Sequence, residues 1–147
     1  MIDNRKLELA KALGATHVIN SGRENAAASV RALCSGRGAD IAFEAVGLSQ
    51  TLNTAIDSVR LGGSVVMVGN VARKAELPLQ KCVTQQITLY GSCASSGEYD
   101  ICLDLIAHQM VDVDSLISAS APLAEGAEWF GRLHAAEPGL IKVVLRP

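Results

Sequence analysis

The sequence is poor in aromatic residues and has no long apolar segment. Among 147 residues there are only one Trp, two Tyr and two Phe. No apolar run approaches the roughly 20 residues that a membrane-spanning helix needs, and the first residues do not resemble a signal peptide. We therefore expect a cytoplasmic protein without a membrane partner.

The sequence also lacks clusters of positive charge and cysteine spacings typical of metal sites. The 13 Lys and Arg are scattered, the formal net charge is −2, and no basic cluster suggests a nucleic-acid partner. The cysteines Cys34, Cys82, Cys93 and Cys102 include no Cys-x-x-Cys pair, so we do not expect them to bind zinc. We expect them to be free thiols that are mostly buried.

Small and aliphatic residues are abundant. Hydrophobic residues make up 49% of the chain, with many Ala, Val, Leu and Gly among its residues. This composition is typical of α/β proteins, in which helices pack closely on a sheet. The length is sufficient for one domain with a substantial core.

Residues 40–70 organise the rest of the chain. Residues 40–47 and 64–69 are short apolar runs that each end in glycine, as expected for strands buried on both faces. Between them, apolar side chains recur at helical spacing after Ser49, which is placed to cap a helix. The pattern predicts a parallel βαβ unit. A glycine at each strand end would let a ligand approach the backbone closely.

Weaker patterns extend this α/β interpretation along the chain. Helices are expected at 5–13, 25–33, 78–85, 98–109 and around 127–133, and strands at 16–20, 87–91, 117–121 and 141–145. We expect Ile101 and Cys102 to face inward, and Trp129 and Phe130 to be packing residues. We expect Glu44 to accept hydrogen bonds from the backbone or to cap a helix, rather than to act as a base.

Several pieces of the sequence resemble one enzyme family in order and spacing. They are residues 5–15, 38–40 with 44–47, 61–63 before 68–69, 87–92 and 139–145. In these pieces the chain resembles the C-terminal part of the zinc-type medium-chain dehydrogenase/reductase family, most closely its sorbitol-dehydrogenase-like polyol branch. The resemblance implies an α/β fold with an incomplete Rossmann-type parallel sheet, strands 3 to 6. It assigns residues 1–92 to this dinucleotide-binding domain and 93–147 to an α+β segment that in the family returns to the catalytic domain.

The resemblance leaves out the family's pyrophosphate-binding turn and its metal ligands. The sequence has no Gly-x-Gly-x-x-Gly turn, which in a dinucleotide fold carries the pyrophosphate at a helix N-terminus. In the family, the Cys, His and Glu that bind zinc lie still further upstream. The chain therefore resembles a dehydrogenase cut at the end of its second Rossmann strand, and we assign it no catalytic residue and no metal ligand.

The same resemblance implies a residual contact surface for NAD at the strand ends. The residues implied are Val46 and Gly47 on the adenosine and ribose side, Val68, Gly69, Asn70, Ser92, Cys93 and Ala94 at the nicotinamide carboxamide, and Lys142 near the pyrophosphate. Each has a plainer alternative. The glycines can be strand-ending turns, Val46 can be a core residue, and Lys142 can be an exposed lysine of an edge strand.

Three functions are compatible with these patterns. The first is the C-terminal fragment of an NAD(H)-dependent alcohol or polyol dehydrogenase that is inactive alone. The polyol branch has an Arg and a Tyr where this chain has Ala94 and Ser95, so the chain departs from the branch at its substrate-holding residues. The second is a non-enzymatic truncated module that self-associates or binds a full-length dehydrogenase subunit. The third is a fragment of a zinc-free quinone-reductase-type oxidoreductase.

The expected sheet also indicates that the chain associates with a partner or rearranges. Without the first two Rossmann strands, the strand at 39–46 has an unpaired apolar edge, which is costly to leave open. We therefore expect a homo-oligomer, or a rearrangement in which residues 16–20 or a partner's strand cover that edge. The family also commonly dimerises through the strand that corresponds to residues 87–91.

Overall fold

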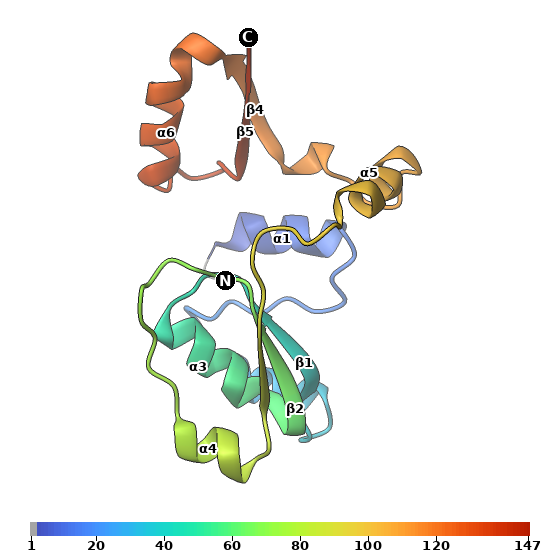
Figure 1. Cartoon of the computed structure of the whole chain (residues 1–147), viewed down its shortest axis with the longest axis vertical. Coiled ribbons are helices and arrows are strands. Elements are labelled where there is room, and N and C mark those ends of the chain that lie inside the picture. The colour runs from blue at the N-terminus through green and yellow to red at the C-terminus, as the bar shows by residue number, and fades with distance from the viewer. Residues whose placement is uncertain (1–2) are drawn as a thin grey trace. The chain divides into compact units, whose positions relative to one another are not determined.

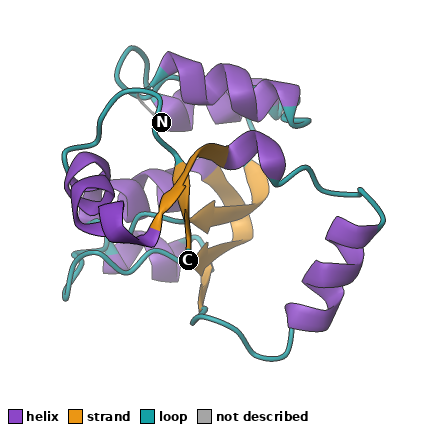
Figure 2. Ribbon diagram, turned by 90° about the horizontal axis from the view of Figure 1, so that it is seen from above, coloured by secondary structure: helices purple, strands orange, loops and turns teal. Residues whose placement is uncertain are grey.

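The computed structural model describes residues 3–147 as two compact units (Figures 1 and 2). The sheet unit is Ile19–Ser96, and the split unit consists of Asp3–Val18 with Gly97–Pro147. Both units combine helices with parallel strands, so the expected α/β class is confirmed. Across the part of the chain described, no helix is both long and apolar enough to cross a membrane.

The sheet unit contains the predicted βαβ unit. Its elements in order are α2 (Ala26–Leu33), β1 (Ala39–Glu44), α3 (Ser49–Ser58), β2 (Val59–Met67), α4 (Leu79–Thr84) and β3 (Thr88–Gly91). The strand order is β1-β2-β3, and both pairings are parallel (Figure 1). Parallel strands need crossover connections, and α3 and α4 provide them.

One face of this sheet forms the core. Ile56 of α3 and Val65 of β2 are fully buried, in a cluster that also contains Leu52, Val59 and Cys82. The opposite face is apolar but open, because Phe43 is 72% exposed and Tyr90 is 54% exposed. The register places Phe43, Val66 and Tyr90 side by side across the strands. The sheet is therefore packed on one side only within this unit.

The predicted strand at residues 16–20 does not form. These residues have no strand assignment in the structure. In a doubly wound sheet of order 3-2-1-4-5-6, the third strand pairs only with the second. No described segment supplies that second strand, so a sequence with strand propensity has no neighbour to pair with.

Ser49 does not cap α3. The capping position is Leu48, and Ser49 is the first residue of the helix. The Ser49 hydroxyl instead accepts a hydrogen bond from the Glu76 N–H at 3.0 Å, while the Asn53 amide donates to the Glu76 carbonyl at 3.2 Å. The start of α3 thus holds the loop that follows β2.

The split unit contains α1 (Asn4–Ala12), α5 (Tyr99–Ala107), β4 (Ile117–Pro122), α6 (Gly126–His134) and β5 (Lys142–Arg146), with short 3₁₀ turns at Asp114–Leu116 and Leu123–Glu125. β4 and β5 pair in parallel. Asp3 caps α1 by accepting a hydrogen bond from the Arg5 N–H at 2.9 Å. Apart from the strand expected at 16–20, the predicted helices and strands of this region are present, with boundaries that shift by one or two residues.

Several expectations about burial are wrong. Ile101 is 64% exposed, Phe130 is 71% exposed, and Cys102 is also exposed. Cys82 is buried and Cys34 is half-buried, whereas Cys93 is exposed, so the cysteines are not mostly buried. An apolar stripe on a helix predicts a buried face only when another element covers it, and sequence periodicity does not show whether one does.

Candidate cofactor-binding edge

The carboxyl ends of β1, β2 and β3 lie at one edge of the sheet. The register pairs Glu44 with Met67 and Met67 with Gly91, so the three strands end level with one another. The residues that follow are 46–47, 68–70 and 92–94, and we call them the strand-end edge. The structure thus gathers the predicted cofactor residues of the sheet unit at one edge. Lys142 belongs to the split unit, where it is exposed at the start of β5.

Gly47 and Gly69 meet backbone to backbone within this edge. A Cβ atom on Gly69 would lie 2.1 Å from the Gly47 nitrogen, and one on Gly47 would lie 2.4 Å from the Asn70 nitrogen. Gly47 also has φ of +86°, in the left-handed region that favours glycine. The close approach that we expected from a ligand is therefore occupied here by the protein's own backbone.

The Glu44 side chain holds the turn that leads to Gly47 through hydrogen bonds from the backbone. Its side chain is buried, with 4% of the residue exposed. Oε1 accepts from the Val46 N–H at 2.8 Å and the Gly47 N–H at 3.0 Å, and Oε2 accepts from the Gly47 N–H at 2.9 Å. The expectation that Glu44 accepts from the backbone is confirmed.

The charge state of Glu44 follows from these contacts. Burial by itself raises the pKa of this carboxyl, but hydrogen bonds from the Gly47 N–H, the Thr51 hydroxyl and the Val46 N–H together hold its pKa below the usual glutamate value. Glu44 is therefore ionised at neutral pH and acts as an acceptor, not as a base.

Further N–H groups of the edge are also used inside the protein. The carbonyl of Glu44 accepts from the N–H groups of Val68, at 2.8 Å, and Gly69, at 2.9 Å. The Ser92 N–H donates to the Met67 carbonyl at 3.0 Å. These hydrogen bonds join the ends of neighbouring strands, and they use backbone N–H donors that a ligand would otherwise bind.

The last part of the edge is the exposed segment after β3. Cys93 is exposed, and Ala94 has φ of +45°, a left-handed conformation that is uncommon for a residue with a side chain. Such positions cluster at functional sites, although they do not identify a ligand.

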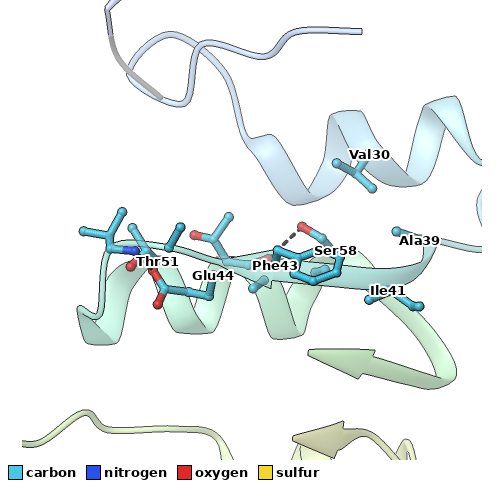
Figure 3. A pocket seen from close by; sticks show the side chains of 12 residues that line it. Val30, Ala39, Ile41, Phe43, Glu44, Thr51 and Ser58 are labelled. Carbon is cyan, nitrogen blue, oxygen red and sulfur yellow. Dashed lines mark hydrogen bonds between the residues drawn. The ribbon is translucent and has the colours of Figure 1, made fainter. Parts of the chain in front are cut away.

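A groove that the sequence pattern did not reveal lies beside the outer edge of β1. It has a volume of about 340 Å³ and is lined by residues of α2, β1 and α3. Figure 3 shows Val30 of α2 projecting toward the strand, with Phe43 and Glu44 on β1 and Thr51 and Ser58 on α3. Apart from Glu44, its lining has no titratable side chain. The sequence-based prediction that relates to this groove is the one that β1 has an unpaired edge.

Groups able to bind a metal ion are not assembled in residues 3–147, where no three His, Cys, Asp or Glu come together suitably. We therefore derive no chemistry through zinc for this chain. His108 of α5 has an acidic neighbour. Its Nδ1 lies 3.2 Å from Asp104 Oδ1, on the exposed surface of α5.

Comparison with known proteins agrees with this geometry. Residues 1–108 match the family described as zinc-binding dehydrogenase. The chain is 29% identical to sorbitol dehydrogenase of Bacillus subtilis, over 97% of this chain and 40% of that protein. It is 30% identical to D-arabitol-phosphate dehydrogenase of Enterococcus avium, over 97% of this chain and 41% of that protein. An alcohol dehydrogenase structure from Thermus sp. ATN1 is similar, with a TM-score of 0.85 and 32% identity, over 98% of this chain and 41% of that one.

The chain thus spans about 40% of the length of these curated relatives. The family match covers most of its residues, and the parallel strands and glycine-ended turns are those that the sequence predicted. The chain therefore belongs to the zinc-binding dehydrogenase family, in its zinc-type medium-chain group, and corresponds to the C-terminal part of its members.

Proposed function

We propose that the chain is the C-terminal portion of an NAD(H)-dependent alcohol or polyol dehydrogenase and that its strand-end edge contacts the cofactor, with residues 68–70 and 92–94 at the nicotinamide and residues 46–47 on the adenosine and ribose side. The observation that supports this most is the level ending of three parallel strands, because ligands of open α/β sheets bind outside the carboxyl ends of the strands. The names of the relatives, sorbitol and D-arabitol-phosphate dehydrogenase, support a polyol substrate for the complete enzyme.

In this proposal the chain orients the cofactor and does not perform catalysis alone. NAD, when bound, supplies the hydride-accepting ring. The backbone carbonyls of residues 68–70 and 92–94 would accept hydrogen bonds from the carboxamide. Hydride transfer also needs a polarised alcohol oxygen, for which residues 3–147 assemble no metal site.

A second candidate function, binding a protein partner, is favoured by the open side of the sheet. Within residues 3–147, β1 has a strand neighbour on one side only, and its Ile41 and Phe43 side chains are 55% and 72% exposed. Unpaired strand edges are templates for pairing with another chain. A homo-oligomer or a complex with a full-length dehydrogenase subunit would cover this surface.

Titration of NADH fluorescence tests the first proposal. We expect saturable binding in the millimolar range or tighter, weakened about tenfold by C93W. Cys93 and Cys102 are both exposed, so C102W is a matched control that should leave binding unchanged. Absence of saturable binding, or equal weakening by both variants, would refute the cofactor assignment.

A further inference from the structure

We propose that the outer edge of β1 pairs with the same edge of a second copy of this chain, antiparallel and about a two-fold axis at Ala42. This inference rests on the second candidate function, binding of a protein partner, and names the partner, the strand and the register. The outer edge of β1 lies on the opposite side of the sheet from β3, the strand through which the resemblance implies that the family dimerises.

The backbone groups of β1 alternate between its paired side and its open side. The Glu44 carbonyl points to β2, because it accepts from the Val68 N–H at 2.8 Å. Along a strand, the N–H and C=O of one residue point to one side and those of the next residue point to the other. Ala42 therefore also faces β2. The N–H and C=O groups of Ile41 and Phe43 face outward, where the described part of the chain supplies no strand.

These outward groups are complementary to themselves. When two β1 strands run antiparallel with Ala42 opposite Ala42, Ile41 of each copy lies opposite Phe43 of the other. Residues in a hydrogen-bonded pair of this kind exchange both of their N–H···O bonds, so every outward group of Ile41 and Phe43 has a partner. The same patch is used on both copies, so the contact closes on itself and leaves no open edge at β1.

The side chains match in the same register. Ile41 and Phe43 are 55% and 72% exposed on the open face of the sheet, and the pairing places each beside the other across the two strands. Cross-strand pairs of an aromatic with a β-branched residue stabilise sheets. On the opposite face the axis brings two alanines together, and the groove of about 340 Å³ beside β1 provides space for the second strand (Figure 3).

Charge favours this register as well. Arg37 and Arg60 both bind the Asp40 carboxylate, at 3.0 Å and 2.6 Å, and two arginines against one aspartate leave a net positive charge. With Ala42 on the axis, Asp40 of each copy lies opposite Glu44 of the other. The Glu44 carboxylate is held by backbone N–H groups and not by a cation of its own chain. The positive cluster of one copy therefore lies next to the negative charge of the other.

A disulfide across the axis tests the register. Directly opposite residues that are not hydrogen-bonded have Cα atoms about 4.5 Å apart, a separation that a disulfide can span. We expect A42C to form a covalent dimer linked through position 42 in oxidised glutathione, with the link identified by peptide mass spectrometry to separate it from native cysteines. I41C is the matched control. Its two new cysteines would be diagonal neighbours, about 7 to 8 Å apart, and should not cross-link.

Amide hydrogen exchange by NMR tests the same pairing in the intact chain. The Ile41 and Phe43 N–H groups should be at least about tenfold more protected at concentrations where the chain is dimeric than after dilution. The Ala42 N–H faces β2 and should be protected at both concentrations.

The outcomes separate this inference from the functions on which it rests. A dimeric mass in light scattering, without the link through position 42 or without protection of the Ile41 and Phe43 amides, would overturn this inference alone, because another surface would then hold the dimer. A monomer at every concentration would overturn self-association together with this inference. Neither result bears on the cofactor proposal, which the NADH titration tests separately.

Discussion

Gly47 and Gly69 are packed so closely that neither can carry a side chain. The Cβ of an alanine at position 69 would lie 2.1 Å from the Gly47 nitrogen, and backbone atoms cannot move aside as a flexible side chain can. The contact joins the ends of β1 and β2, and the Ala72 N–H reinforces it by donating to the Gly47 carbonyl at 2.9 Å. The shape of the strand-end edge therefore depends on this glycine pair.

We predict that Gly69→Ala destabilises the chain by about 3 kcal/mol or more, because overpacking against backbone forces β1 and β2 apart. Gly91 ends β3 at the same edge, but a Cβ there would meet nothing within 4 Å, so Gly91→Ala should change stability by less than about 0.5 kcal/mol. Urea unfolding followed by circular dichroism measures both. Equal effects of the two substitutions would contradict the backbone contact.

Glu44 should make stability depend on acid pH. Its folded-state pKa lies below the usual value, so its stabilising contribution is complete above the unfolded pKa of about 4.3 and is lost as pH falls through the folded value. We predict that the intact chain loses more stability than E44Q between pH 6 and pH 3. Urea midpoints at several pH values measure this difference, with E76Q as a control that should follow the intact chain. Curves for E44Q and the intact chain that fall in parallel would refute the prediction.

The helix α3 should depend on its buried stripe. Ile56 is fully buried against β2, so Ile56→Ala leaves a cavity and should cost about 2 to 5 kcal/mol. Leu79 begins α4 and is 69% exposed, so Leu79→Ala should have little effect. Thermal unfolding distinguishes the two. A small loss for Ile56→Ala would mean that the core of the sheet unit lies elsewhere.

The open face of the sheet should drive self-association. We predict that the chain forms a homo-oligomer and that Phe43→Lys lowers its mass toward the 15.4 kDa of a single chain, because a lysine on an exposed strand disfavours pairing. Leu79→Lys places the same charge on an exposed apolar position of α4 and should leave association unchanged. Light scattering after size-exclusion chromatography measures the mass. A monomer at every concentration would refute self-association.

Sequence reasoning identified the elements whose pattern is local. The strands around residues 40–47 and 64–69 and the helix between them have continuous apolar runs and helical spacing, so their type does not depend on distant residues. The strand expected at 16–20 does not form because a strand needs a neighbouring strand to pair with. The residues themselves do not show whether such a neighbour is present. The exposed Ile101 and Phe130 show the same limit for helices.

The sequence predicted where the candidate site lies, but not how the backbone N–H groups of the site are used. Glycines after apolar strands predicted where the strand ends would gather. That Glu44 would take the N–H groups of Val46, Gly47, Val68 and Gly69 depends on the path of the turn, which the glycine motif alone does not specify. The groove beside β1 likewise depends on how α2 and α3 lie along an edge that pattern analysis predicted only as unpaired.

The central claim, that three strand ends form one cofactor-binding edge, is tested most directly by NMR of the ¹⁵N-labelled chain during NADH titration. The account predicts that the largest shifts of backbone amides fall together on residues 46–47, 68–70 and 92–94 and saturate with a single dissociation constant. Shifts that are absent, or that fall on other parts of Ile19–Ser96 and leave these strand ends unchanged, would contradict it.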